Sequence, residues 1–186
     1  MTTPIHVLGI SGSLRRAGWN TGLLHAAGEL LPEGMALEIA DLADIPLYNQ
    51  DNDGPNAPDP VKHFKQRIRA ADALLIATPE YNGSITGVLK NAIDWASRPM
   101  SDSPLSGKPL AIMGAGGISG TIRAQLALRQ LSTAVNTLII NRPQVQIMRS
   151  WEKFDADGKL TDEQSRQEIR ALLEALAAWT RRLRGE

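Results

Sequence analysis

The sequence predicts an α/β protein in which five parallel strands form a sheet covered by helices on both faces. Short apolar runs alternate with segments of helical periodicity along most of the chain, and this alternation is typical of parallel sheets. Right-handed crossovers between successive strands then favour a doubly wound sandwich. A length of 186 residues favours a single domain over residues 1–186, because this length is enough to bury a substantial core.

The elements can be assigned in order from their apolar patterns. Continuous apolar runs predict strands, and apolar residues three or four positions apart predict helices. The expected strands are residues 5–10, 35–40, 73–77, 109–113 and 137–140, and the expected helices are residues 20–31, 60–71, 87–96, 119–134 and a last helix carrying Ile169, Leu172, Leu173, Leu176 and Leu183.

Two long segments, residues 41–59 and 141–160, show no regular pattern. The first is rich in Pro, Asn and Asp, and loops of this length are usually lids, partner surfaces or disordered segments. Within the second, residues 155–159 read Asp-Ala-Asp-Gly-Lys. A calcium loop needs further ligands and a closing Glu, so this stretch is expected to be a solvated turn.

Composition excludes several classes of function. The chain has no cysteine, which excludes thiol catalysis, disulfides and cysteine-bound iron–sulfur clusters. His6, His25 and His63 are far apart in the sequence and do not have the spacing of metal ligands, so no metal site is expected. The formal net charge is zero, which argues against nucleic acid as the main partner.

No apolar run is long enough to span a membrane. The first residues lack the basic region of a signal peptide and lead almost directly into a strand. We therefore expect a cytoplasmic protein that does not insert into membranes.

The loop after the first strand has the residue types of a phosphate site. It leads into a helix N-terminus, where free backbone N–H groups and the helix dipole favour an anion. Hydroxyl, amide and guanidinium groups add donors, with Arg15 or Arg16 supplying the charge. The predicted cofactor-binding residues of this loop are Ser11, Ser13, Leu14, Arg15, Asn20 and Thr21. The alternative is a turn whose serine and asparagine side chains only cap the helix.

Two other nucleotide-binding motifs do not match this loop. A P-loop ends in Gly-Lys followed by Ser or Thr, but the first lysine of the chain is Lys62. A dinucleotide fingerprint has three glycines, and Ser11 stands where the second is expected. Hydroxyl groups in place of bare backbone favour a terminal monophosphate over a pyrophosphate.

The loops after the third and fourth strands suit a flat ring that forms hydrogen bonds. Ligands of open α/β sheets bind where loops leave the carboxyl ends of the strands, and glycines there let backbone approach a ligand closely. The predicted ring-binding residues are Pro79, Glu80, Tyr81, Asn82 and Gly83 in the third loop and Gly114, Ala115, Gly116 and Gly117 in the fourth. The alternatives are a polar loop in which Tyr81 shields the edge of the core, and a flexible glycine turn.

The glycine-rich fourth loop superficially resembles a dinucleotide fingerprint. However, the chain has no acidic residue between Asp102 and Glu152, so the acid that holds the ribose in such sites is missing. Close packing over a ring or an incoming nicotinamide is the better interpretation of this loop.

Of five further side chains, three have two open interpretations. Arg98 suits either a substrate phosphate or the carbonyl end of its helix, and Arg123 suits either a subunit contact or an anion. Tyr48 is expected to hold down the long loop as an apolar plug, with a ligand or partner role as the alternative. Lys90 and Asp94 are expected to form a solvated i,i+4 pair.

Several motifs together resemble those of NAD(P)H-dependent FMN reductases, a flavodoxin-like family that includes bacterial quinone and chromate reductases. The most specific motif is the block from Pro79 to Trp95. The other motifs are Gly12-Ser13-Leu14-Arg15 with Asn20, Ile45-Pro46-Leu47-Tyr48, and Arg123-Ala124-Gln125 with Leu128-Arg129. The resemblance covers residues 5–150.

The resemblance implies a flavodoxin-like three-layer sandwich with strand order 2-1-3-4-5 and FMN at the carboxyl edge of the sheet. The first loop would bind the FMN phosphate, the third would line the isoalloxazine, and the fourth would flank the ring and the ribityl chain. It also implies a homodimer or homotetramer. The sequence departs from close relatives at Leu126, where many have a tyrosine that contacts other subunits, at Gly116-Gly117, where many have serine, and at Thr86, where many have proline.

The predicted activity is transfer of a hydride from NAD(P)H through FMN N5 to a second acceptor, by a ping-pong mechanism. The candidate acceptors are quinones, free flavins, chromate, azo compounds and ferric complexes. Because the cofactor performs the difficult chemistry, no catalytic acid or base is expected. One alternative is a flavodoxin-type electron carrier without a substrate of its own, although such carriers are strongly acidic and this chain is neutral. Another is a nucleotide-sensing module that binds no flavin. The residues do not distinguish NADH from NADPH.

Overall fold

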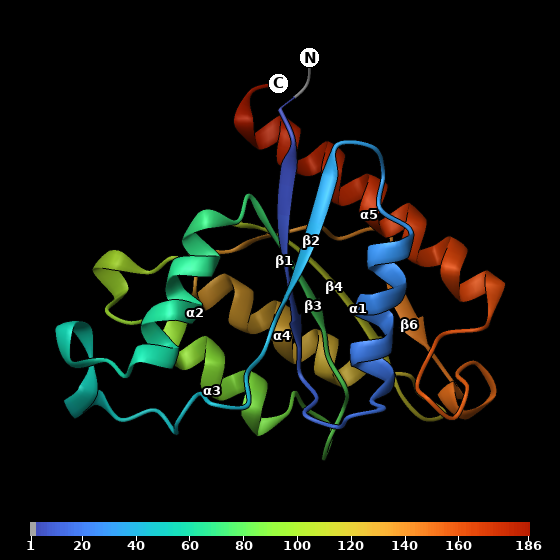
Figure 1. Ribbon diagram of the computed structural model, residues 1–186, viewed down its shortest axis with the longest axis horizontal. Helices are drawn as coiled ribbons and strands as arrows, with labels where there is room; N and C mark the ends of the chain where they lie inside the picture. The colour runs from blue at the N-terminus through green and yellow to red at the C-terminus, as the bar shows by residue number, and fades with distance from the viewer. Residues whose placement is uncertain (1–2) are drawn as a thin grey trace.

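A computed structural model of the chain describes residues 3–186 and shows a parallel sheet between two layers of helices (Figure 1). The strands are β1 (Ile5–Ser11), β2 (Met35–Ala40), β3 (Ala73–Ala77), β4 (Pro109–Ala115), β5 (Leu138–Ile139) and β6 (Val145–Ile147). The α-helices are α1 (Trp19–Glu29), α2 (Asp59–Ala70), α3 (Gly87–Ala96), α4 (Ile122–Ala134) and α5 (Glu163–Arg184). The strand order β2-β1-β3-β4-β5 confirms the predicted order and the flavodoxin-like fold.

The fifth strand lies within the predicted residues 137–140 but is only two residues long, and a further strand, β6, was not predicted. β5 pairs with the first residues of β4, and β6 pairs with the last three residues of β4, which are Met113, Gly114 and Ala115. β6 lies inside the segment that was expected to be irregular. Its pattern of buried Val145, half-buried Gln146 and buried Ile147 is only three residues long, too short for a periodic signal to stand out.

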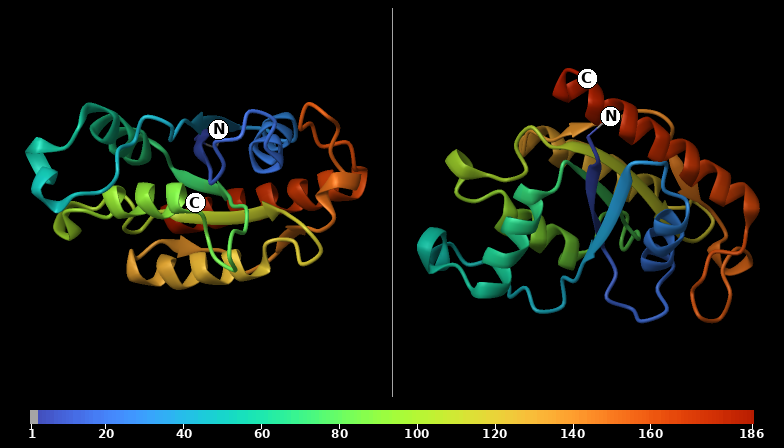
Figure 2. Two further views of the ribbon diagram at one scale, coloured as in Figure 1. Left: turned by 90° about the horizontal axis from the view of Figure 1, so that it is seen from below. Right: turned by 45° about the horizontal axis from the view of Figure 1, so that its top comes forward.

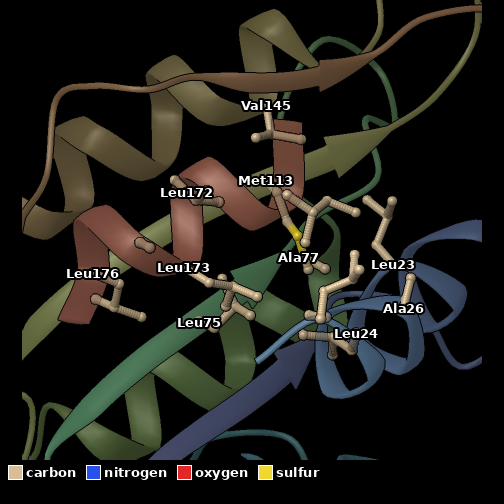
Figure 3. Packing of buried hydrophobic residues seen from close by; sticks show 14 of the residues in the cluster. Leu23, Leu24, Ala26, Leu75, Ala77, Met113, Val145, Leu172, Leu173 and Leu176 are labelled. Atoms are coloured by element: carbon tan, nitrogen blue, oxygen red, sulfur yellow. The ribbon is translucent and has the colours of Figure 1, made fainter. Parts of the chain in front are cut away.

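Alternate residues of the central strands bury side chains in two separate cores. On one face, Ile5, Val7 and Leu75 pack beneath α1 and α5, and Figure 3 shows Leu75 and Met113 among the leucines of these two helices. On the other face, Leu8 and Ile76 pack beneath α2, α3 and α4. Burying a leucine or isoleucine side chain contributes about 1.5–3 kcal/mol, so these two layers are the main stabilising feature of the fold. The side views in Figure 2 show helices on both sides of the sheet.

The long segment after β2 is held against α3 by one aromatic contact and three hydrogen bonds, one of them from the Tyr48 amide to Asn91 Oδ1 at 2.8 Å. Trp95 Nε1 donates to the carbonyl oxygen of Pro46 at 2.8 Å, and Asn91 donates to the same oxygen at 2.8 Å. The Tyr48 ring meets the buried Trp95 ring edge-on, with 4.9 Å between ring centroids. The interpretation of Tyr48 as an apolar plug is therefore confirmed.

Two smaller expectations are also confirmed. Lys90 and Asp94 form the i,i+4 ion pair on α3, with 2.7 Å between Nζ and Oδ1. The stretch after residue 154 is a turn closed by a bridge between Phe154 and Leu160. Between residues 3 and 186, no helix has the length and apolar character needed to cross a bilayer.

Candidate active site

Residues from three loops line one hollow at the carboxyl edge of the sheet. Its volume is about 180 Å³. Nine of its lining residues were predicted from the sequence: Ser13, Arg15, Asn20, Pro79, Glu80, Tyr81, Ala115, Gly116 and Gly117. Gly18 and Trp19 complete the lining and were missed. The local sequence contains no signal that distinguishes Trp19 from a tryptophan of the core.

The first loop keeps its donors available. α1 begins after Gly18 without a side-chain cap from any residue that the structure describes. The first backbone N–H groups of this helix therefore donate no hydrogen bond to a side chain of the described residues. The Arg15 guanidinium lies 5.9 Å from the centre of the Trp19 ring. Within residues 3–186, no carboxylate forms an ion pair with Arg15. An uncapped helix N-terminus beside an unpaired arginine is suited to a phosphate group.

Ser11 and Thr21 shape this loop from beneath rather than lining the hollow. The Ser11 hydroxyl lies 2.9 Å from the Thr21 hydroxyl and accepts a hydrogen bond from the Ser13 amide at 3.2 Å. Ser13 in turn accepts from the Arg15 amide through its own hydroxyl at 3.3 Å. Leu14, the remaining predicted residue of the loop, is exposed and does not line the hollow.

Asn20 joins the first loop to the fourth. Its side-chain nitrogen donates to the Ala115 carbonyl at 2.9 Å, and its side-chain oxygen accepts from the Ala115 amide at 3.0 Å. The side chain is only 3% exposed. Because both of its polar atoms are engaged with β4, Asn20 fixes the distance between two walls of the hollow.

The third loop projects from the sheet as a tight hairpin. Tyr81 and Ser84 exchange both backbone hydrogen bonds, each at 3.1 Å. Asn82 (φ 52°) and Gly83 (φ 74°) occupy its two central positions, and positive φ at both is characteristic of a type I′ turn. Tyr81 is 54% exposed, so it does not shield the edge of the core as the alternative interpretation required. Tyr81 is one of the residues that line the hollow.

The Glu80 carboxylate is turned towards α4. It accepts from the backbone amides of Arg123 at 2.9 Å and Ala124 at 3.3 Å, and from Arg123 Nε at 2.7 Å. Burial raises the pKa of Glu80, but the hydrogen bonds from Arg123 and the two amides outweigh it and hold that pKa below its usual value. Glu80 therefore acts as an ionised cap for α4, and Arg123 forms an ion pair within the chain.

The fourth loop uses its glycines to pack against its own chain. A Cβ atom on Gly114 would lie 1.9 Å from Thr121 Oγ1 and 2.6 Å from the Thr78 carbonyl oxygen. A Cβ atom on Gly116 would lie 2.3 Å from the Gly120 carbonyl oxygen. Gly114 does not line the hollow, whereas Gly116 and Gly117 do. These close approaches within the chain explain why positions 114 and 116 are glycine, and no ligand is needed for that explanation.

The other hollows do not contain the predicted residues. Arg98 lines a hollow of about 360 Å³ between α3 and α4, separate from the candidate site. Two larger hollows of about 430 Å³ lie beside β5 and α5 and beside α1. The volume of a hollow is therefore a poorer guide to the candidate site than the presence of hydrogen-bond donors and aromatic rings in its lining. Across residues 3–186, no cluster of three His, Cys, Asp or Glu side chains could bind a metal ion.

Comparison with known proteins identifies the family of this chain. Residues 5–152 match the family model of NADPH-dependent FMN reductases. The chain is 52% identical over its whole length, and over the whole of the relative, to an NAD(P)H-dependent FMN reductase of Pseudomonas aeruginosa. It is 43% identical to an NAD(P)H:quinone oxidoreductase of Solanum tuberosum, with 98% of this chain and 96% of the relative covered. The solved structure of FerB, a flavoenzyme NAD(P)H:(acceptor) oxidoreductase from Paracoccus denitrificans, superposes with a TM-score of 0.86 at 34% identity and covers 96% of this chain and 98% of FerB.

Proposed function

Because the chain belongs to the NADPH-dependent FMN reductase family, we propose that the hollow at the carboxyl edge binds FMN and that quinones are its main acceptors. The protein is an NAD(P)H-dependent oxidoreductase, and FMN is its cofactor. The proposal concerns the finer points: where the cofactor binds, which acceptors are reduced, and in what order the substrates bind. Among the relatives, those of potato and of a Burkholderia species are named as reductases of quinones.

The observation that carries the proposal is the convergence of nine predicted residues on one hollow, beside a helix end with free donors. The phosphate of FMN would lie at the start of α1, where Ser13 and Arg15 offer a hydroxyl and a guanidinium. The ring would lie between the Pro79–Tyr81 segment and the Ala115–Gly117 backbone, which approach the hollow from opposite sides. These residue types fit a phosphorylated flavin.

When bound, FMN supplies the redox chemistry, since it takes a hydride from NAD(P)H and passes electrons to the acceptor. The residues of the chain would bind the cofactor and orient it. Asn20 fixes the first loop to β4, and Glu80 fixes the third loop to α4. Tyr81 is exposed where it lines the hollow, and the nicotinamide and the acceptor would use the same face of the flavin ring in turn.

Steady-state kinetics with a panel of acceptors tests the activity. The panel contains a benzoquinone, free riboflavin, chromate, an azo dye and ferric citrate, each measured with NADH and with NADPH. We expect the benzoquinone to give the highest kcat/KM and double-reciprocal plots to be parallel. Intersecting plots would exclude the ping-pong order, and no consumption of NAD(P)H with any acceptor would favour the flavodoxin-type carrier.

Replacing Ser13 and Arg15 by alanine tests the phosphate position. A hydrogen bond to a charged group contributes about 1.5–3 kcal/mol, so we expect the double variant to bind FMN at least about tenfold more weakly. Riboflavin, which lacks the phosphate, should bind both proteins equally. The matched control is Arg170→Ala, which removes an exposed arginine of α5. Unchanged FMN affinity in the double variant would place the phosphate elsewhere.

We also propose that the protein is a homodimer. Ile122 and Leu126 are exposed one turn apart at the start of α4, and Ile118 is exposed in the loop before this helix. Exposed apolar groups that lie together mark interaction surfaces. We expect Leu126→Glu to shift the mass measured by light scattering from dimer to monomer, while Leu47→Glu, at another exposed leucine, leaves the dimer intact. A monomeric wild type would refute this proposal.

A further inference from the structure

The hairpin that follows β6 packs directly against the first loop, which joins β1 to α1. This hairpin lies beyond residues 5–152, where the family model matches. Its two sides are Phe154 and Leu160, joined by a backbone bridge. Figure 1 shows this hairpin in orange beside the first turn of α1 in blue. Two contacts connect it to the loop and the start of α1, and hydrogen bonds within the turn hold its shape.

The first contact is between two backbones. A Cβ atom on Gly22, in the first turn of α1, would lie 2.0 Å from the Gly158 carbonyl oxygen. A Cβ atom on Gly158 (φ 79°) would lie 2.9 Å from the backbone carbonyl of Ala17. Glycine is unfavourable inside a helix, so Gly22 is explained by the hairpin that it admits. The turn therefore fixes Ala17 and, through it, the end of the phosphate loop.

The second contact is a chain of three side chains. The Phe154 ring lies 6.2 Å from the Trp19 ring, centroid to centroid. The Arg15 guanidinium also lies 5.9 Å from the centre of the Trp19 ring, at a distance where a cation is attracted to an aromatic face. Trp19 is thus close both to the hairpin and to Arg15, the cationic side chain among the residues that line the hollow.

The third feature is the rigidity of the turn itself. Asp155 Oδ1 accepts hydrogen bonds from the Asp157 amide at 3.0 Å and the Lys159 amide at 2.8 Å. These bonds hold the turn in one shape without a ligand, which explains the Asp-Ala-Asp-Gly-Lys sequence that the proposed function leaves unused.

We propose that Trp19 and the 154–160 hairpin are positioning elements that hold Arg15 in place for the cofactor phosphate, and thereby determine how strongly the protein prefers FMN to riboflavin. This inference rests on the proposed function, because it requires the phosphate to lie at the start of α1. It assigns a role in cofactor selection to a turn that is distant in sequence from every other residue of the site.

The ratio of the dissociation constants for riboflavin and FMN is the readout, measured on the full chain by quenching of flavin fluorescence. We expect Gly22→Ala to lower this ratio about tenfold, comparable to the loss of one charge-assisted hydrogen bond, by weakening FMN binding alone. The matched control is Gly28→Ala on the same helix, where the nearest atom to the new Cβ would be 3.9 Å away. Gly28→Ala should leave both constants unchanged.

A second variant keeps the test decisive if Gly22→Ala does not fold. Trp19→Leu and Arg15→Ala, alone and combined, form a double-mutant cycle. If Trp19 acts through Arg15, Trp19→Leu will weaken FMN binding in the wild type but not in the Arg15→Ala background. Additive losses, or equal losses for FMN and riboflavin, would overturn the inference and leave Trp19 a structural residue. An unchanged ratio in Arg15→Ala itself would instead refute the phosphate position in the proposed function.

Discussion

The β1–α1 loop and the β4–α4 loop leave the same edge of the sheet, and both are rich in small residues, yet they use them differently. In the first loop, Arg15 has no carboxylate partner within residues 3–186 and α1 starts without a side-chain cap. In the second, the glycines let the chain fold tightly on itself, and the start of α4 is capped by Glu80. A glycine-rich loop at a sheet edge can therefore serve a ligand or its own backbone, and composition does not distinguish the two.

The largest effect should come from adding a methyl group in the packed loop. Gly114→Ala would place a Cβ 1.9 Å from Thr121 Oγ1 and 2.6 Å from a backbone oxygen, and overpacking of this kind costs about 3 kcal/mol. Urea denaturation monitored by circular dichroism measures the loss. Gly117→Ala is the matched control, because its nearest neighbour is a Trp151 ring carbon at 4.0 Å. Equal stabilities for the two variants would show that the loop can open to accept a side chain.

A smaller effect is expected at the cap that joins the third loop to α4. Glu80→Gln keeps an acceptor for the two amides but removes the charge that faces Arg123 and the helix N-terminus, so we expect a loss of about 1–2 kcal/mol at pH 7. Asp94→Asn, in the exposed pair with Lys90, is the control and should lose about 0.5 kcal/mol or less.

The stability difference between wild type and Glu80→Gln should depend on pH, and the direction of this dependence follows from the pKa of Glu80. The pKa of Glu80 is lower in the folded protein than in the unfolded chain, so its charge stabilises the fold above the unfolded pKa of about 4.3. That contribution is lost as the pH falls through the lowered value. The stability difference between wild type and Glu80→Gln should thus be full above about pH 5 and shrink in more acidic solution. A difference that stays constant down to pH 3 would contradict this account.

The smallest effect concerns the hairpin of the third loop, which resembles neither of the other two loops. Asn82 has a φ of 52°, a conformation that asparagine tolerates better than alanine. We expect Asn82→Ala to cost about 1 kcal/mol and Asn82→Gly to change the stability little. Thermal unfolding of the three proteins measures this, and an alanine variant as stable as wild type would mean that the turn adopts another type.

Much of the site could be predicted because strands and loops are local features. The buried run before Pro79 and the serine-rich loop after β1 both have their signals within a few residues of sequence. Parallel strands then bring their carboxyl ends to one edge, so Ser13, Tyr81 and Gly117 could be expected to meet. The aromatic residue Trp19 was missed because nothing local distinguishes a tryptophan in the core from one that lines a hollow.

The roles of individual side chains could not be predicted, because their partners are far away in the chain. Asn20 has the composition of a phosphate donor but bonds to Ala115, 95 positions later. Glu80 was assigned to the ring, and its carboxylate caps a helix 43 positions later. β6 could not be predicted because three residues are too few to show a periodic pattern. Only its pairing with β4 defines it as a strand.

The sequence by itself determined the order of strands and helices, the edge at which the candidate site lies and the residue types that line it, since these follow from hydrophobic periodicity and chain direction. Only the tertiary structure decided which donors stay unpaired and which form hydrogen bonds within the protein. The physical reason is that a buried polar group must find a partner, and where that partner lies depends on packing between segments that are distant in sequence.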